Sequence, residues 1–251
     1  MAIKSCIKRT LTLATLIYGC GVTSVNAQIA QQISQQNADK LVQGGNDATG
    51  GIGDWSLSNG TLCAIISDVD HESEFSTKGG VLIDLGFCGR PDDAYTFSQD
   101  LIDGKRTRPL DTQAIYAENT NNSASITVQS KHHGLSQTTR YQLNSDNLTQ
   151  LKISKILTRH DNEDESDFNF LSSVYFNISS LAPFIFASNN LNKNTGFTLH
   201  EFVDTGIKAL PNAAHQADTI ITISPPDALK PIAYGWQINS VTRLDLSLIH
   251  I

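Results

Sequence analysis

Short runs in which apolar and polar residues alternate follow one another along this chain. In residues 123–131, Ala124, Ile126 and Val128 recur at every second position, which places them on one face of a strand. Runs of the same kind, rich in β-branched and aromatic residues, predict further strands in 54–59, 61–68, 80–86, 114–119, 138–144, 148–159, 169–178, 218–224 and 232–239.

The run 148–159 needs one irregularity to fit this pattern. Its apolar residues share a face only if a β-bulge shifts the alternation between them: Leu148, Leu151, Ile153 and Ile156. Turn-forming residues separate the runs, and no helical pattern of 10–15 residues alternates with them. The sequence therefore predicts an all-β fold, a large antiparallel sandwich of two sheets.

The N-terminal 27 residues have the pattern of a secretory signal peptide. Lys4, Lys8 and Arg9 precede an apolar stretch, and the small residues of 25–27 precede Gln28. The apolar stretch is shorter than the roughly 20 residues of a membrane-spanning helix. We therefore expect cleavage after Ala27 and export to the periplasm or the extracellular space.

Residues 16–20 offer a second interpretation, because they resemble a lipobox that ends at Cys20. In that case Cys20 would be lipidated and the product would be an outer-membrane lipoprotein. Tyr18 is bulky where small or β-branched residues are usual, so simple removal of Cys20 with the signal peptide is favoured.

The charge of the chain bears on its partners. The net charge is −7, and loss of the signal peptide, with its three positive and no negative side chains, would make it −10. Such an acidic chain repels phosphate backbones, so we expect no nucleic-acid partner. No stretch after the signal peptide is apolar enough to span a membrane.

The chain divides into four parts by composition. After the signal peptide, residues 28–46 are rich in Gln and Asn and are expected to form a polar linker or a short helix. Residues 47–245 are expected to form the β-sandwich domain, complete or not. Residues 246–251 match the translation of a transposon-end sequencing adapter, so we expect them to be a non-native tail, with a true terminal strand as the alternative.

Two cysteines remain in the expected mature chain, Cys63 and Cys88. In an oxidising compartment they could form a disulfide that closes a loop of about 25 residues and stabilises the fold by roughly 3–4 kcal/mol. Two free thiols on neighbouring strands are the alternative. No other Cys or His lies at metal-ligand spacing from them, so a zinc site is not expected.

Acidic and imidazole side chains gather in a few places, and each has a structural alternative. Asp68, Asp70 and His71 would share a cation if the strand before them aligned the two carboxylates, but a polar loop is favoured. Residues 160–167 suggest calcium ligands or, preferably, a solvated loop. For residues 132–134 a turn is the favoured interpretation. Residues 200–201 lack the His-Glu-x-x-His spacing of a zinc protease, and His215 is an isolated imidazole.

Other polar and aromatic positions also have both a functional and a structural interpretation. Residues 78–81 either permit a close backbone approach or turn the chain into a strand, and 90–93 read as a turn rather than an acid–base pair. Trp55 and Trp236, with Tyr95 and Tyr234, could line a sugar-binding groove, although core packing is the default for scattered aromatics. No motif identifies catalytic residues, and no cofactor is indicated.

Several stretches taken together resemble a known arrangement. Residues 53–60 contain Gly-Asp-Trp before a strand, 79–84 read Gly-Gly-Val-Leu-Ile-Asp, and the similarity continues through 134–143, 148–159 and 231–238. The order resembles the N-terminal β-supersandwich region of large exported bacterial proteins, a region similar in shape to galactose-mutarotase-like domains. In some relatives it precedes a metallohydrolase domain of the polymerase-and-histidinol-phosphatase type, in the carbaryl-esterase-like group.

The resemblance covers about residues 47–240 and implies a sandwich without a catalytic site. The His-x-His motif of such hydrolases is absent from the chain, so no catalytic residue is carried over. The expectation is an exported, non-catalytic β-sandwich domain, the accessory part of a larger secreted hydrolase whose catalytic domain would follow it. The alternatives are a carbohydrate-binding or mutarotase-like module and a structural protein of the cell envelope.

Overall fold

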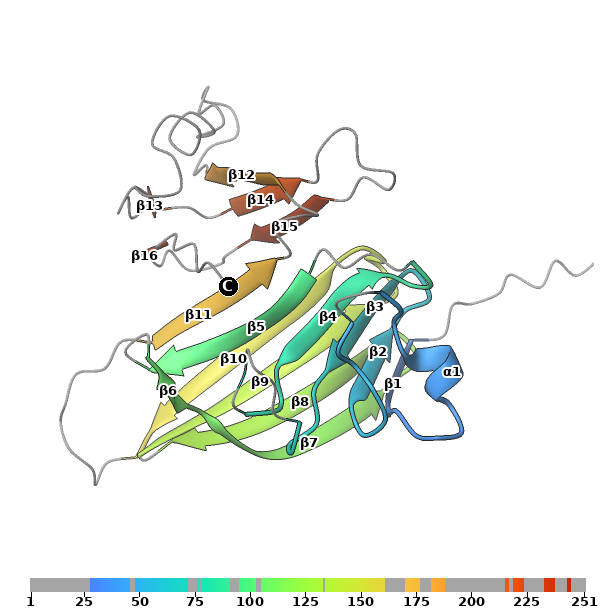
Figure 1. The fold of residues 1–251 in the computed structure, drawn as a ribbon, viewed down its shortest axis with the longest axis horizontal. Coiled ribbons are helices and arrows are strands. Elements are labelled where there is room, and N and C mark those ends of the chain that lie inside the picture. Colours follow the sequence, from blue (N-terminus) through green and yellow to red (C-terminus); the bar gives the residue numbers. More distant parts are fainter. Residues whose placement is uncertain are drawn as a thin grey trace, which may run out of the picture.

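The computed structural model of this chain describes residues 28–45, 48–71, 76, 78–90, 95–102, 105–132, 134–160, 170–176, 182–187, 215–216, 219–223, 233–237 and 243–244. Within these ranges it is almost entirely β, and two antiparallel sheets of four strands each face one another (Figure 1). This is the all-β sandwich that the alternating pattern predicts.

The first sheet has the order β1-β2-β3-β4. Its strands are β1 (Ile29–Gln32), β2 (Trp55–Ser58), β3 (Leu62–Ile66) and β4 (Leu82–Phe87), and β3 is buried along its whole length. The short helix α1 (Ala38–Leu41) lies on the outer side of this sheet (Figure 1). Residues 28–46, expected to form a linker or a short helix, thus supply both a strand and a helix.

The second sheet has the order β10-β9-β8-β7 and consists of longer strands. They are β7 (Asp111–Asn119), β8 (Ser123–His132), β9 (Leu135–Asn144) and β10 (Leu151–Arg159). The bulge expected among the apolar residues of 148–159 is absent from β10, because β10 pairs with β9 in continuous register from Leu151 to Arg159. Ile153 and Ile156 therefore lie on opposite faces, and the prediction that they share one face was wrong.

A third sheet continues the first layer beside β4 (Figure 1). It has the order β11-β5-β6 and comprises β5 (Tyr95–Ile102), β6 (Lys105–Pro109) and β11 (Phe170–Phe176). Later strands form a sheet of order β12-β14-β15 and the pair β13–β16. Their bounds are β12 (Ala182–Ala187), β13 (His215–Gln216), β14 (Thr219–Ile223), β15 (Ala233–Gln237) and β16 (Arg243–Leu244).

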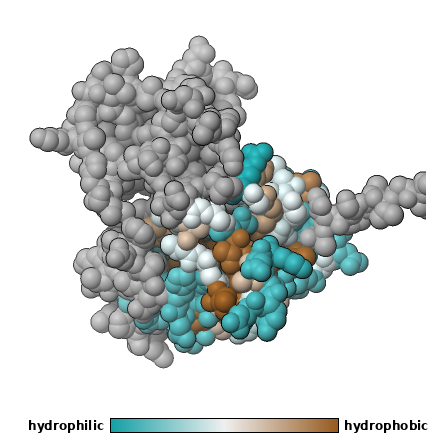
Figure 2. Space-filling view, turned by 45° about the vertical axis from the view of Figure 1, so that its right-hand side comes forward, coloured by the Kyte–Doolittle hydropathy of each residue, from teal (hydrophilic) through white to brown (hydrophobic). Residues whose placement is uncertain are grey.

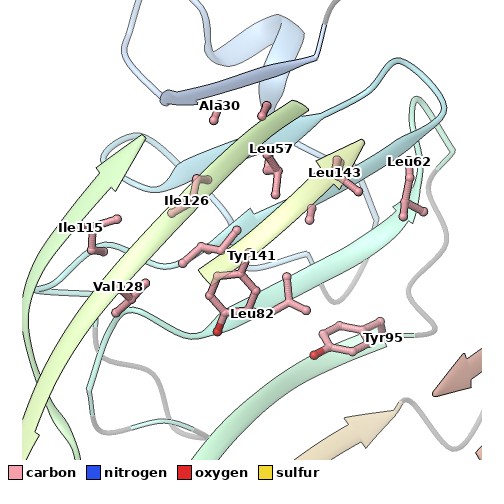
Figure 3. Packing of buried hydrophobic residues seen from close by; sticks show 13 residues of the cluster. Ala30, Leu57, Leu62, Leu82, Tyr95, Ile115, Ile126, Val128, Tyr141 and Leu143 are labelled. Atoms are coloured by element: carbon pink, nitrogen blue, oxygen red, sulfur yellow. The ribbon is translucent and has the colours of Figure 1, made fainter. Parts of the chain in front are cut away.

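The main core lies between the two four-stranded sheets (Figure 3). Ala124, Ile126 and Val128 of β8 point into it and are almost fully buried, which confirms the alternation predicted for this strand. They meet apolar side chains of the opposite layer, Leu57, Ala64, Ile66 and Leu82. Each large aliphatic side chain buried in this way stabilises the fold by about 1.5–3 kcal/mol.

A smaller apolar cluster lies elsewhere in the first layer. It contains Ile33, Ile65, Ile83 and Phe97, with Leu41 of α1 packed against it.

On the surface shown in Figure 2, hydrophobic residues of the described part form small separate groups among hydrophilic ones. No helix in the described ranges is long and apolar enough to cross a membrane.

Cys63 and Cys88 form a disulfide with an S–S distance of 2.12 Å. It joins β3 to the turn that follows β4, two strands already paired in the first sheet. Ser58 of β2 places its hydroxyl 3.3 Å from the sulfur of Cys63 and 3.4 Å from that of Cys88. Of the two alternatives for these cysteines, the structure thus has the paired one.

Candidate functional site: a polar cleft between the sheets

One end of the sandwich interior is lined by polar as well as apolar side chains. The space, which we call the inner cleft, has a volume of about 40 Å³ and lies between the inner face of the β7–β10 sheet and the residues of 76–81 and β5. Hydroxyl, amide and charged groups from five segments converge on it: Ser98, Asp100, Thr112, Ser130, Gln137, Thr139 and Lys155.

The Asp100 carboxylate joins four strands at one side of the inner cleft. It accepts hydrogen bonds from Gln137 Nε2 of β9 (2.5 Å), Lys155 Nζ of β10 (2.5 Å) and Ser172 Oγ of β11 (2.7 Å). The Lys155 ammonium supplies the countercharge, so the partly buried carboxylate is both paired and hydrogen-bonded.

Gln137 has an acceptor that the described chain leaves unused. Its side chain is only 4% exposed, and its Nε2 donates to Asp100 Oδ2 and to Thr139 Oγ1 (2.7 Å). An ionised carboxylate only accepts hydrogen bonds, so the nitrogen of the amide must face Asp100. The other atom, Oε1, is buried and has no hydrogen-bond partner. Such an unsatisfied carbonyl costs about 1–3 kcal/mol.

Thr112, Ser130 and Gln137 form a row across three strands of the inner face. Thr112 of β7 is paired with Ser130 of β8, and Ser130 is paired with Gln137 of β9. Thr112 Oγ1 donates to the carbonyl oxygen of Gly79 (2.6 Å), and its distance to Ser130 Oγ is 3.3 Å. Because the Thr112 proton is used by Gly79, Ser130 must be the donor to Thr112.

Two glycines let the opposite wall approach this row. A Cβ atom at Gly79 would lie 1.6 Å from the carbonyl oxygen of Asp68, and one at Gly80 would lie 2.6 Å from Thr112 Oγ1. Gly80 also has a φ of 78°, in the left-handed region that favours glycine. Residues 78–81 therefore both make a close backbone approach and lead into β4, the two alternatives considered from sequence.

A wider space, which we call the outer hollow, lies next to the inner cleft. Its volume is about 350 Å³, it is open to solvent, and it is lined by Val69, Asp70, Lys78, Asp111, Thr112 and Gln113. Lys78 and Thr112 line both spaces, so the inner cleft and the outer hollow are adjacent. Lys78 Nζ lies 3.3 Å from Asp111 Oδ1, so these two charges on the rim are paired, and Asp70 adds a second carboxylate to the rim.

Two buried tyrosines lie close to the inner cleft, and Tyr141 is one of its lining residues. Burial raises the pKa of both Tyr95 and Tyr141 well above that of a free phenol. Nearby carboxylates, Asp100 in both cases, raise it further. Both tyrosines are therefore neutral hydrogen-bonding groups at physiological pH (their positions are labelled in Figure 3).

Two of the three residues proposed as metal ligands have partners of their own. His71 Nδ1 lies 2.7 Å from Asp54 Oδ1, whereas Asp68 accepts a hydrogen bond from the Trp55 indole at 3.1 Å. Asp70 instead lines the outer hollow. Within the described residues, no group of three or more His, Cys, Asp or Glu side chains is arranged to hold a metal ion.

Asp54 organises this loop and is itself only 2% exposed. Besides contacting His71, its carboxylate accepts hydrogen bonds from the backbone N–H of Asp68 (2.8 Å) and of Gly51 (2.8 Å). These bonds hold residues 67–71, including Val69 and Asp70, along the rim of the outer hollow. The loop reading of this segment fits its position after the end of β3.

Of the four aromatic residues proposed for a sugar groove, Trp55 and Tyr95 have described side chains, and both belong to the main core. Trp55 packs against the main core and Tyr95 is part of it, as the default of core packing anticipates. Trp236 lies in β15 opposite Ile220, but its side chain is outside the described structure.

Two of the histidines considered from sequence lie at the ends of strands. His132 ends β8, and His160, which follows β10, has its Nε2 atom 3.0 Å from Ser136 Oγ.

Other candidates fall outside the described residues or side chains. These are the signal peptide with Cys20, residue 133, the paired carboxylates of 92–93, the acidic run after His160, residues 200–201, the side chain of His215 and the tail 246–251. The predictions made for them stay predictions.

Sequence reasoning missed the residues of the inner cleft. A signal was present in residues 135–144, where polar side chains occur at both the odd and the even positions of a strand. Gln137 and Thr139 take inward positions there and are buried. A strand that is polar on both faces indicates that its inner face meets a polar interior.

Comparisons of the chain with protein families, with curated proteins and with solved structures find no match.

Proposed function

We propose that this chain is an exported, non-catalytic β-sandwich domain that binds carbohydrate at the inner cleft and outer hollow. Its role would be that of an accessory domain in a larger secreted hydrolase. The observation that carries the proposal is the polar lining of the sandwich interior around Gln137, at a place where apolar packing would otherwise fill the space between the layers.

The chemistry of the lining favours a carbohydrate. Burying polar groups is costly unless they are hydrogen-bonded, so a polar interior is kept only where it has a use. Binding sites typically combine a concave space with a few converging polar groups. Here the charged groups of the inner cleft are paired within the chain, Asp100 with Lys155 and Lys78 with Asp111. The remaining hydroxyl and amide groups suit a neutral, hydroxylated ligand.

Two observations support the rest of the proposal. The disulfide between Cys63 and Cys88 is typical of proteins that fold in an oxidising compartment, in agreement with the signal-peptide pattern of residues 1–27. The accessory role is supported by the resemblance of residues 47–240 to supersandwich regions that precede hydrolase domains. A β-sandwich fold is consistent with that resemblance.

Retention on immobilised polysaccharides tests the binding function. The full chain, exported by a bacterial host and purified with its disulfide intact, would be passed over cellulose, xylan, mannan, chitin, starch and peptidoglycan. We expect specific retention on at least one of them. Ser130→Ala should weaken it about fivefold, the effect of one lost hydrogen bond. Gln129→Ala is the matched control, since Gln129 is exposed on the other face of β8. No retention on any matrix would contradict the proposal.

The accessory role has a separate test. It predicts that the native gene continues in frame beyond codon 245 into a region that encodes a His-x-His motif. Sequencing of the native locus would show this directly, and a stop codon immediately after codon 245 would overturn the accessory role while leaving carbohydrate binding untouched.

A further inference from the structure

The hydrogen-bond direction along the row Thr112–Ser130–Gln137 restricts the chemistry of a ligand. Ser130 donates to Thr112, and Thr112 donates to the carbonyl oxygen of Gly79, so both hydroxyl protons are used within the chain. What Ser130 still offers is a lone pair. Gln137 likewise offers only Oε1, since its Nε2 bonds to Asp100 and Thr139. The row therefore presents acceptors, and a ligand must bring donors.

The dimensions of the inner cleft and the outer hollow restrict the shape of a ligand. The inner cleft, at about 40 Å³, has room for roughly three water-sized groups, taking about 10–15 Å³ for each. A sugar ring is too large for it, whereas two or three carbons of an open chain, each with a hydroxyl group, are of the right size. The outer hollow, at about 350 Å³, is wide enough for a ring.

The charges restrict the ligand further. Asp100 is paired with Lys155 at the inner cleft, and Asp111 is paired with Lys78 at the rim. The charged residues that line the inner cleft are thus already paired, so an ionised group placed there would lack a countercharge, and a charge buried without one is strongly destabilising. An ammonium ion, which also donates hydrogen bonds, is disfavoured for this reason, and a neutral alcohol is favoured.

We infer that the inner cleft binds a short, neutral, open-chain polyol arm, whose hydroxyl groups donate to Ser130 Oγ and Gln137 Oε1, while a ring carried on the same ligand stays in the outer hollow. This inference rests on the proposed carbohydrate-binding function and names the part of the ligand that the interior selects. Gln137, whose unpaired acceptor is buried at the inner cleft, is the residue that determines the specificity of this cleft.

A matched pair of polyols tests the inference. Sorbitol and myo-inositol each have six carbons and six hydroxyl groups, but sorbitol is an open chain and myo-inositol is a ring. In calorimetric or NMR titrations of the full chain, we expect sorbitol to bind at least tenfold more tightly than myo-inositol. Ethanolamine, tested beside ethylene glycol, should bind more weakly because of its charge. Equal affinity for the open chain and the ring would overturn the inference.

The variant Gln137→Met tests whether Gln137 is the residue that selects an open-chain polyol. Gln137→Met keeps the length of the side chain and removes its acceptor, so the affinity for sorbitol should fall about fivefold to tenfold. Gln129→Met, on the exposed face of β8, should leave it unchanged. Unchanged sorbitol binding in folded Gln137→Met would contradict the inference. If Gln137→Met does not fold, the comparison of the two polyols on the wild-type chain decides alone.

The outcomes separate the two proposals. If the chain is retained on a polysaccharide but shows no preference for sorbitol, the inner cleft does not select an open chain and the inference fails while the proposed function stands. If the chain binds neither polysaccharides nor polyols, the proposed function fails, and the inference fails with it.

Discussion

The carbonyl oxygen of Asp68 occupies the place that a side chain on residue 79 would need. A Cβ atom there would be 1.6 Å from that oxygen, far inside any tolerated contact. The oxygen belongs to the backbone of a loop that Asp54 holds through the backbone N–H of Asp68. At the residue scale, the geometry of the inner cleft thus depends on one glycine and one buried carboxylate.

Gly79→Ala tests this dependence. The loop of 67–71 or the entry to β4 must move to admit the methyl group, so we expect the free energy of unfolding to fall by about 3 kcal/mol or more. Urea denaturation of the two proteins gives the difference. Gly44→Ala is the control, because a Cβ atom there meets nothing within 4 Å. Equal stability of Gly79→Ala and the wild type would contradict the described approach.

The buried tyrosines predict a loss of stability at alkaline pH. In the unfolded chain, Tyr95 and Tyr141 ionise with a pKa of about 10, whereas burial raises the pKa of both in the native state. Above pH about 10 the unfolded state therefore binds fewer protons than the native state. The free energy of unfolding then falls as the pH rises, by up to about 1.4 kcal/mol per pH unit for each tyrosine.

Urea denaturation at pH 9, 10 and 11 measures this slope. Below the pKa of the unfolded tyrosines, the two residues contribute no pH dependence. We expect Tyr95→Phe and Tyr141→Phe each to reduce the alkaline slope. A slope in both variants that equals the slope of the wild type would show that the buried phenols do not cause the loss.

At the scale of elements, the alternating pattern predicted the buried strand β8 correctly because its inward residues are all apolar between Ala124 and Val128. For β10 the same pattern led to a wrong prediction. Ile153 lies opposite the inward Tyr141, but Ile156 lies opposite the outward Thr138 and is 66% exposed. A strand with apolar side chains on both faces does not reveal from its sequence which face is inner; its partner strand decides.

β1 and β9 show a second limit of the pattern. β1 belongs to a Gln-rich segment, and Ala30, which it buries, gives too weak an apolar signal to predict a strand. In β9, the buried Gln137 donates hydrogen bonds to Asp100 of β5 and to its own strand neighbour Thr139. Gln137 and Asp100 are 37 residues apart in the sequence, and hydrophobic periodicity carries no information about such a distant hydrogen-bond partner.

The disulfide gives a prediction at the scale of strands. It closes a loop of 25 residues between β3 and the end of β4. Reduction, or the double variant Cys63→Ser/Cys88→Ser, should lower the free energy of unfolding by about 3–4 kcal/mol, mainly because the unfolded chain gains freedom. Urea denaturation with and without reductant measures the change. The wild type should respond to reductant and the double variant should not; a wild type that is insensitive to reductant would contradict the prediction.

At the scale of the whole molecule, the sandwich has two kinds of interior. Between β2–β4 and β7–β9 the layers are held together by buried aliphatic side chains (Figure 3), and towards β5 the space is lined by hydroxyls, amides and one ion pair. A ligand that binds only the folded chain adds to its stability through mass action. The central claim is that this polar end is the binding site.

Methyl NMR spectroscopy of the full chain tests that claim most directly. The chain would be titrated with oligosaccharide from the polysaccharide that retains it. Leu110 and Val128 line the inner cleft, whereas Ile33 and Ile65 belong to the separate apolar cluster. The account predicts that the methyl signals of Leu110 and Val128 shift with saturation while those of Ile33 and Ile65 stay unchanged. Saturable binding that leaves the signals of Leu110 and Val128 unmoved would contradict it.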